Sequence, residues 1–345
     1  MTKGIYIYGI VPNFYSTTQF QLLENSGVYA VSFENISAIV SDRNGTSLDY
    51  DDRESLGHLL IHHQKTIESL RNKGFTMLIP MRLGTIVSSK GEVIKILARG
   101  YDLIIDTLKK IEHLTEIDLV VTWLDFSGIL KEVSSHPEIA ALKEEILKKN
   151  GEPSQLDRVK IGMLVQGKLE EKNKSVELKV LDVLSSYGLD IKIHEVMNDE
   201  MVSNSAFLIH SNNQKKFELA IERLDEEYNN ILKFKLIGPL PCYSFYTLEV
   251  KSLSPEQVEQ AGIVLGLNEQ TSESGIKKAY LENARLFHPD THPGNGDQDN
   301  FNRINKAYHT LLDYTAAVKQ SSKQEIISLT KEKMNENLIL VKIKE

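Results

Sequence analysis

The first third of the chain consists largely of short runs in which apolar and polar residues alternate, the spacing expected of β-strands. These runs predict strands over Gly4–Val11, Val28–Phe33, Ile36–Ser41 and Phe75–Ile79, with a hairpin-like turn at Glu34-Asn35. Two longer stretches repeat apolar residues every three or four positions and predict helices: the first ends at Gly74, and the second covers Glu92–Leu114 behind a cap at Ser88 or Ser89. We therefore expect residues 1–115 to form an α+β domain.

The middle of the chain follows a different order of elements. Runs rich in β-branched and aromatic residues predict strands at Ile117–Phe126, Asp190–Met197, Asn204–His210, Lys233–Pro239 and Tyr243–Val250. A short helix beginning near Pro137 and a long one ending at Gly188 separate the first two strands, and another helix precedes the fourth. The order β-α-β-β-α-β is that of the ferredoxin-like fold, with its helices on one face and an extra strand at the end. Residues 116–250 are the second predicted domain.

Helical spacing returns after a polar linker, Lys251–Glu256, in which Ser254-Pro255 marks a helix start. A short helix and two amphipathic ones are predicted there. Packed antiparallel, the two amphipathic helices would project the loop that contains His288-Pro289-Asp290 from one end of a hairpin. Residues 251–320 are thus the third domain of an α+β multidomain protein, and this domain is expected to be all-α. The tail, residues 321–345, contains an alternating run, Asn337–Lys344, that we expect to add an edge strand to an earlier sheet.

Composition narrows the class of protein. The chain has 345 residues, a formal net charge of −8 and one cysteine, Cys242. The length indicates two or three domains, the negative charge argues against a general nucleic-acid binder, and a single cysteine excludes an internal disulfide. No stretch approaches the length of a membrane span. We expect a cytoplasmic protein with neither a nucleic-acid nor a membrane partner.

The loop at His288-Pro289-Asp290 allows three interpretations. His288 suits the negative end of a helix dipole, Pro289 ends a helix, and Asp290 accepts backbone hydrogen bonds in a turn. Together they describe an ordinary helix stop, but the same side chains could coordinate a metal or contact a partner protein. The amphipathic helices on either side favour a docking corner, because they would hold the loop exposed.

The C-terminal helices resemble a J-domain, the DnaJ-type module that engages a DnaK-type heat-shock chaperone. The motifs that carry the resemblance are "LGL" (Leu265–Leu267), "IKKAY" (Ile276–Tyr280), "HPD" and "FNRINKAYHTLL" (Phe301–Leu312). The resemblance implies that His288, Pro289 and Asp290 contact the ATPase domain of the chaperone and stimulate hydrolysis. It also implies that Lys277, Lys278 and Arg285 attract its acidic surface. A J-like platform for some other partner is the alternative.

Residues from the start of the chain to about Val250 resemble the GvpL/GvpF family of gas vesicle proteins. The motifs are "GIYIYGIV" at the start, "HHQ" (His62–Gln64), "LIPMRLGTIV" (Leu78–Val87) and "LIGPLPCYSFYTLEV" (Leu236–Val250). The resemblance implies two α+β domains, the second a modified ferredoxin-like one, and an accessory role in gas vesicle formation. It further implies binding of the small, very hydrophobic shell protein GvpA. Aromatic side chains that could offer an apolar patch to GvpA are Tyr243, Phe245 and Tyr246, and ordinary strand packing is the alternative for each.

Other candidate chemistry is weaker. His58 and His62 lie one helical turn apart, as in some zinc sites, with His63 adjacent, but no glutamate lies between them as in HExxH. Packing or a surface position is the simpler interpretation, and we predict no metal and no cofactor. Arg82 lacks the glycines and the lysine of a phosphate loop, and we expect it to pair with an acid near a domain interface. Nothing in the chain has the pattern of a catalytic site, and we predict that the protein is not an enzyme.

The leading hypothesis is a gas vesicle assembly protein that holds GvpA and, through its J-like domain, recruits a DnaK-type chaperone to it; other accessory proteins of the vesicle are further expected partners. The alternative is a minor structural component of the vesicle whose J-like domain is only a protein-binding surface. An enzyme or metal protein that uses His58, His62 and His288 is the third possibility.

Overall fold

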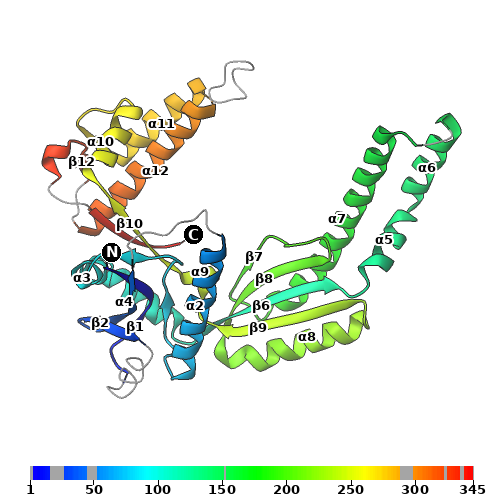
Figure 1. Ribbon diagram of the computed structural model, residues 1–345, viewed down its shortest axis with the longest axis horizontal. Helices are drawn as coiled ribbons and strands as arrows, with labels where there is room; N and C mark the ends of the chain where they lie inside the picture. Colours follow the sequence, from blue (N-terminus) through cyan, green and yellow to red (C-terminus); the bar gives the residue numbers. More distant parts are fainter. Residues whose placement is uncertain are drawn as a thin grey trace. The chain divides into compact units, whose positions relative to one another are not determined.

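The structure is a computed structural model that describes residues 3–15, 27–44, 53–150, 153–287, 298–321, 325–334 and 338–344. It separates into two compact units, the first made of Met1–Lys109 with Tyr246–Glu345, and the second of Lys110–Phe245. Figure 1 labels the elements of both. Among the described helices, none combines the length and apolar composition needed to cross a bilayer. The four-part division of the chain stays a prediction.

An antiparallel sheet organises the N-terminal part of the first unit. Its strands are β1 (Lys3–Pro12), β2 (Val28–Phe33), β3 (Ile36–Asn44), β4 (Ile79–Pro80) and β5 (Ile86–Val87). They are ordered β2-β3-β1-β4, and β5 also pairs with β1. The hairpin between β2 and β3 turns at Glu34, whose φ is 49°. The first three predicted strands are confirmed, whereas the strand predicted at Phe75–Ile79 is wrong: only Ile79–Pro80 pairs, and the Met77 amide bonds to the Tyr15 hydroxyl instead.

Helices cover both faces of this sheet. Helix α2 (Arg53–Asn72) lies against the face that carries Tyr6 and Tyr8, while Lys90 of helix α3 (Lys90–Arg99) lies over Tyr29 on the opposite face. Consecutive residues of β1 are therefore buried on both sides, from Ile5 to Tyr8. This double burial explains why isoleucine and tyrosine alternate in the strand without a charged residue between them.

The helix predicted over Glu92–Leu114 is in fact two helices. Ser89 caps α3, as expected, but the chain breaks at Gly100 and resumes as α4 (Tyr101–Ile111). A Cβ atom at Gly100 would lie 2.7 Å from Val341 Cγ1, so the close approach of the C-terminal strand requires glycine there.

A four-stranded antiparallel sheet, ordered β7-β8-β6-β9, organises the second unit. The strands are β6 (Leu114–Trp123), β7 (Asp190–Ile193), β8 (Met201–His210) and β9 (Leu232–Leu240). The helices are α5 (Phe126–Ser134), α6 (Pro137–Asn150), α7 (Gln155–Ser185) and α8 (Gln214–Tyr228), with a 3₁₀ turn, η1 (Ser211–Asn213), before α8. The elements follow the predicted β-α-β-β-α-β order, except that three helices separate the first two strands.

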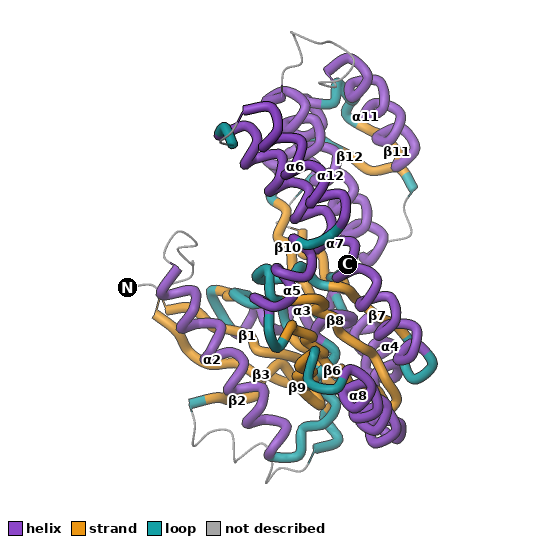
Figure 2. The backbone as a smooth tube through the Cα atoms, turned by 90° about the vertical axis from the view of Figure 1, so that its right-hand side faces the viewer, coloured by secondary structure: helices purple, strands orange, loops and turns teal. Residues whose placement is uncertain are grey.

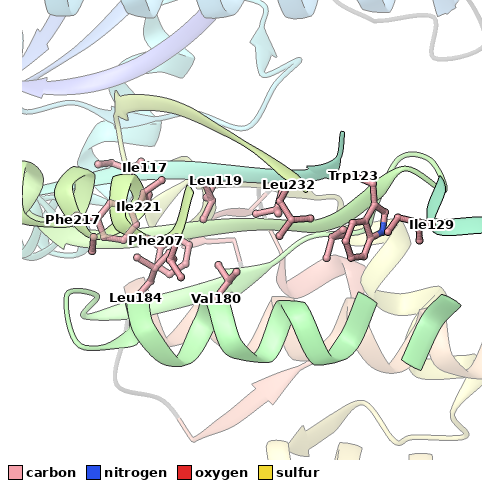
Figure 3. Close-up of a cluster of buried hydrophobic side chains, with 14 of the residues drawn as sticks. Ile117, Leu119, Trp123, Ile129, Val180, Leu184, Phe207, Phe217, Ile221 and Leu232 are labelled. Atoms are coloured by element: carbon pink, nitrogen blue, oxygen red, sulfur yellow. The ribbon is translucent and has the colours of Figure 1, made fainter. Parts of the chain in front are cut away.

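One face of this sheet carries the core of the second unit. Side chains of β6 and β8, among them Ile117, Leu119 and Phe207, lie in one buried cluster with Val180 and Leu184 of α7, as Figure 3 shows. Phe217 and Ile221 of α8 close the same cluster. The predicted strand end at Phe126 is wrong, because Asp125 accepts a hydrogen bond from the Gly128 amide (2.9 Å) and begins α5.

The described residues of the C-terminal region form three helices and two small pairs of strands. The helices are α10 (Pro255–Val264), α11 (Glu273–Phe287) and α12 (Gln298–Ser321). The strands are β10 (Leu248–Leu253), β11 (Gln270–Ser272), β12 (Ile326–Ser328) and β13 (Leu338–Ile343), with a 3₁₀ turn, η2 (Lys331–Lys333). β11 pairs with β12, both labelled in Figure 2. β10 pairs with β13. The region is therefore not all-α, because the tail returns twice as a strand.

One helix cap and two strands were predicted near the ends of this region. Ser254 caps α10 with Pro255 at its first turn, as expected. The tail forms the expected strand, but it pairs with β10 in a separate two-stranded sheet instead of adding an edge to an earlier one. The strand predicted over Tyr243–Val250 is wrong in its first half, where α9 (Tyr243–Tyr246) forms one helical turn. The turn is fixed by Glu116, whose carboxylate accepts hydrogen bonds from the Ser244 amide and hydroxyl, both at 2.8 Å.

Candidate functional site

The predicted docking corner, His288-Pro289-Asp290, lies outside the described residues. The helices on either side of it are described: α11 ends at Phe287 and α12 begins at Gln298. These two helices pack against each other, and they determine which side chains of α11 face solvent. The geometry of the candidate site is therefore built from α11 and α12.

Helix α11 presents a basic outer face. Ile276 is fully buried in the core that α10, α11 and α12 share, and this contact turns the neighbouring positions outward. Lys277, Lys278 and Arg285 are all exposed. Within the described part of the chain, Lys277 and Lys278 make no ion pair. The structure thus places the three predicted cations at exposed positions of one helix, and their role toward an acidic partner stays a prediction.

An aromatic and amide contact holds α11 in register with α12. The rings of Tyr280 and Tyr308 stack with centroids 4.1 Å apart and an angle of 16° between them. The Tyr280 hydroxyl donates to Asn305 Oδ1 at 2.8 Å. Asn283 Nδ2 donates to the carbonyl of Leu265 at 3.3 Å, which ties α11 to the end of α10. These contacts hold α11, which carries the basic face, in a fixed position against α10 and α12.

The aromatic residues predicted to meet GvpA lie in the α9 turn. Phe245 is buried, and Lys192 Nζ lies 5.9 Å from the centre of its ring. Tyr243 and Tyr246 are half-buried. Packing accounts for Phe245, while the two tyrosines retain accessible surface, and their role toward GvpA stays a prediction.

A buried tyrosine–histidine network underlies two of the sequence motifs. The Tyr6 hydroxyl lies 2.8 Å from His63 Nδ1, and the Tyr8 hydroxyl lies 3.2 Å from His62 Nδ1 and 3.0 Å from Ser41 Oγ. Burial, and secondarily the charge of His62, lowers the pKa of His63 to about 4. His63 therefore joins α2 to β1 as a neutral hydrogen-bonding group, and His62 adds a second hydrogen bond between the two elements. In the sequence, the only signal for this network was a pair of tyrosines two residues apart and, later in the chain, a pair of adjacent histidines.

The structure also bears on the candidate metal ligands and on Arg82. In the described part of the chain, no group of three or more histidine, cysteine, aspartate or glutamate side chains is arranged to hold a metal. Arg82 forms the ion pair expected of it: its guanidinium donates to Glu249, which is buried on β10. The Arg82 amide also donates to the Leu248 carbonyl at 2.8 Å. This joins the "LIPMRLGTIV" segment to the strand that leads into α10.

Sequence reasoning missed an acidic pair on β6. Glu116 and Asp118 lie on the sheet face opposite the core, and His194 Nε2 lies 3.2 Å from Ser244 Oγ in the same cluster. Burial is the main cause that raises the pKa of Glu116, to about 8, and it also raises the pKa of Asp118. Asp118 Oδ1 is buried and has no hydrogen-bond partner among the described residues. Glu116 is the member of the pair that holds the α9 turn, through Ser244.

Comparison with known families identifies the larger part of the chain. The profile of the family described as "Gas vesicle synthesis protein GvpL/GvpF" matches residues 4–247. The chain belongs to the GvpL/GvpF family. Gas vesicle protein F of Nostoc sp. strain PCC 7120 is 23% identical over 248 residues, which cover 71% of this chain and 98% of that protein. Gas vesicle protein F of Microcystis aeruginosa is 22% identical over 250 residues, which cover 72% of this chain and all of that protein.

Solved structures agree with the fold of this GvpL/GvpF protein. The crystal structure of GvpF from Anabaena sp. PCC7120 superposes with a TM-score of 0.57 at 22% identity, covering 70% of this chain and 97% of the other. The DnaJ-domain profile matches residues 263–317. Chaperone protein DnaJ 1 of Aquifex aeolicus is 44% identical over 50 residues, which are 14% of this chain and 14% of that protein. The predicted fusion of the two families is confirmed.

Proposed function

We propose that this GvpL/GvpF protein is a non-enzymatic assembly factor that binds the shell protein GvpA and recruits a DnaK-type chaperone to it. The observation that carries the proposal is the union, in one chain, of a gas vesicle synthesis family with a DnaJ-type helical region. Both activities would take place in the cytoplasm, at the growing vesicle. Joining them places the chaperone within reach of the client and raises its local concentration without any additional contact.

The proposed recruitment of the chaperone rests on the charge of α11 and on the contacts that hold this helix in place. Lys277 and Lys278 are exposed and without ion pairs among the described residues, and the contact between Tyr280 and Tyr308 holds their helix in place. An acidic surface on the ATPase domain would be drawn to this face. His288, Pro289 and Asp290 would then contact that domain and stimulate hydrolysis.

The GvpA half rests on the family and on the chemistry of a shell subunit. A protein that walls off gas has an apolar surface, and such a surface aggregates in water unless it is covered. Tyr243 and Tyr246 are half-buried aromatic side chains in the α9 turn and supply part of a complementary patch. The strand order β7-β8-β6-β9, antiparallel throughout, supports a ferredoxin-like arrangement of the second domain, with the α9 turn just beyond its last strand.

One experiment tests the chaperone half. The ATPase rate of a DnaK-type chaperone is measured with the full-length protein and with its His288→Gln variant. Stimulation by the wild type that the variant loses supports recruitment, whereas equal rates with both proteins contradict it. If neither protein stimulates, and the wild type is found stoichiometrically in washed vesicles, the protein is a structural component with a J-like binding surface.

A second experiment tests the GvpA half independently. GvpA is co-expressed with the full-length protein or with a Tyr243→Ser/Tyr246→Ser variant, and the amount of GvpA that co-purifies at cytoplasmic salt is measured. Co-purification that falls several-fold in the variant supports the proposed patch. If GvpA is absent even with the wild type, the assembly role is contradicted whatever the outcome for the chaperone.

A further inference from the structure

The C-terminal region contains a second candidate surface, on the side of α12 that faces α10. A groove of about 790 Å³ runs between α10, α12 and the end of β10. Its volume is in the range of cavities that hold drug-sized ligands or the side chains of a bound peptide. Both helices are labelled in Figure 1, and no residue of α11 lines the groove.

The floor of the groove is apolar and is lined by small or buried side chains. Leu253, Ala261 and Ala307 are each buried and line it, with Val264 at one end. Alanine on both facing helices leaves room that larger side chains would fill. Along α12, lining residues extend from Arg303 to Asp313, which corresponds to roughly 15 Å of helix. A helix of about three turns has that length.

The charged side chains around the groove differ in whether they already have an ion-pair partner. Asp313 is already neutralised, since Lys251 Nζ and Lys342 Nζ lie 2.6 and 3.1 Å from its carboxylate oxygens. Glu256 likewise pairs with Lys331. Arg303 and Lys306 are exposed and make no ion pair within the described part of the chain.

The groove is therefore locally basic in a protein whose formal net charge is −8. Arg303 and Lys306 lie three residues apart, so they extend from one side of α12 about a helical turn from each other. A partner that matched them would carry two carboxylates with the same spacing beside an apolar face.

We propose that this groove docks an acidic amphipathic helix of a partner protein. The apolar face of that helix would pack against Ala261, Val264 and Ala307, and two of its carboxylates, one turn apart, would pair with Arg303 and Lys306. This is helix-in-groove recognition, in which apolar anchors supply affinity and charge fixes register. The site is separate from the basic face of α11, so the region can hold a second protein while α11 engages the chaperone.

The test uses a synthetic fourteen-residue helical peptide, a length of roughly four turns, with leucines on one face and two glutamates one turn apart beside it. A matched peptide replaces the glutamates with lysines. Binding to the full-length protein is followed by fluorescence anisotropy at low and physiological salt. The glutamate peptide should bind at least about tenfold more tightly than the lysine peptide, and less tightly as salt rises.

Variants locate the binding. Arg303→Glu/Lys306→Glu changes two exposed side chains, and it should weaken binding of the glutamate peptide at least about tenfold and reverse the preference between peptides. Gln260→Trp, which places a large ring in the groove from an exposed position, should weaken binding of both peptides. Lys277→Glu/Lys278→Glu on α11 is the matched control and should leave binding unchanged. Circular dichroism establishes that each variant is folded.

Three results would overturn the proposal. One is failure of the glutamate peptide to bind at millimolar concentration, and another is loss of binding in the α11 control but not in the groove variants. The third is a protein that is dimeric by sedimentation and becomes monomeric with Arg303→Glu/Lys306→Glu, because the occupant would then be a second copy of this chain. Since neither GvpA nor DnaK is present in the assay, its outcome is independent of the proposed function.

Discussion

Arg82 and Glu249, which are 167 positions apart in the chain, form an ion pair in which the guanidinium donates to the carboxylate. The side chain of Glu249 is 9% exposed and that of Arg82 is 57% exposed. The pair therefore gives a nearly buried carboxylate its cation at the beginning of β10, the strand that leads into α10 and pairs with the C-terminal β13.

Replacing the cation should destabilise the first unit. We expect Arg82→Met to cost about 1–2 kcal/mol of unfolding free energy, because it leaves the Glu249 carboxylate buried without its partner, while the exposure of Arg82 limits the loss. Adding Glu249→Gln should restore part of that stability. Denaturant unfolding followed by circular dichroism measures both. Arg99→Met, an exposed arginine at the end of α3, is the control, and equal midpoints for the two arginine variants would refute this role of the pair.

The network around His63 predicts that the folded protein loses stability as the pH falls. The pKa of His63 is lowered to about 4 in the folded protein, against 6.5 for an ordinary histidine. The unfolded chain therefore binds a proton first as pH falls, and the folded state loses roughly 3 kcal/mol between pH 6.5 and 4. His63→Gln, which keeps a partner for the Tyr6 hydroxyl, should reduce this loss, as measured by denaturant midpoints across that range.

His58 provides the matched control for this acid-dependent loss. It lies on the same helix with a side chain that is 78% exposed, near Glu54. His58→Gln should show the same acid dependence as the wild type, because this exposed side chain takes no part in the buried network. The interpretation fails if His63→Gln and the wild type lose stability in parallel as pH falls.

The elements that the sequence predicted well are those determined by local periodicity. Strands β1, β2 and β3 follow from alternation, and the caps at Ser89 and Ser254 follow from residue type next to a helical pattern. The boundaries that were wrong depend on distant contacts. Glycine is needed at the break because Val341 packs there, and the helical turn at Tyr243 is held by the hydrogen bonds from Ser244 to Glu116. Local periodicity carries no signal of either contact.

The same distinction applies to the candidate site. Lys277, Lys278 and Arg285 were recognisable because they precede a known tripeptide on an amphipathic helix, and the structure places all three in solvent. The tyrosine–histidine network and the groove between α10 and α12 could not be predicted, because each is made of residues that only the tertiary fold brings together. In the groove, for example, nothing in the sequence distinguishes Ala261 and Ala307 from other helix residues, because only the fold places their helices opposite each other.

Glu116 predicts the opposite dependence on pH from His63. Its pKa is raised to about 8, chiefly by burial, whereas in the unfolded chain it is near 4.5. The unfolded state therefore loses its proton first as pH rises, and the second unit loses stability between pH 4.5 and 8. Glu116→Gln should remove this loss, so that the variant gains stability relative to the wild type as pH rises. Tryptophan fluorescence reports this unit directly, because Trp123, the chain's single tryptophan, lies in its core.

Glu112→Gln is the control for this second titration, because Glu112 is exposed beyond the end of α4. It should leave the pH dependence of the Trp123 transition unchanged. A difference between wild type and Glu116→Gln that is constant from pH 5 to pH 8 would mean that the proton on Glu116 does not contribute.

Charge reversal on α11 tests whether its basic face attracts the chaperone, provided that the proposed recruitment holds. Lys277→Glu/Lys278→Glu should lower stimulation of the chaperone ATPase at least about tenfold at low salt, because two attractive charges become repulsive. The defect should shrink as salt rises and screens the charges. Lys215→Glu/Lys216→Glu makes the same change of net charge on α8, in the other unit, and should leave stimulation as in the wild type. If both double variants lost activity equally, the overall charge of the protein, and not the face of α11, would govern the encounter.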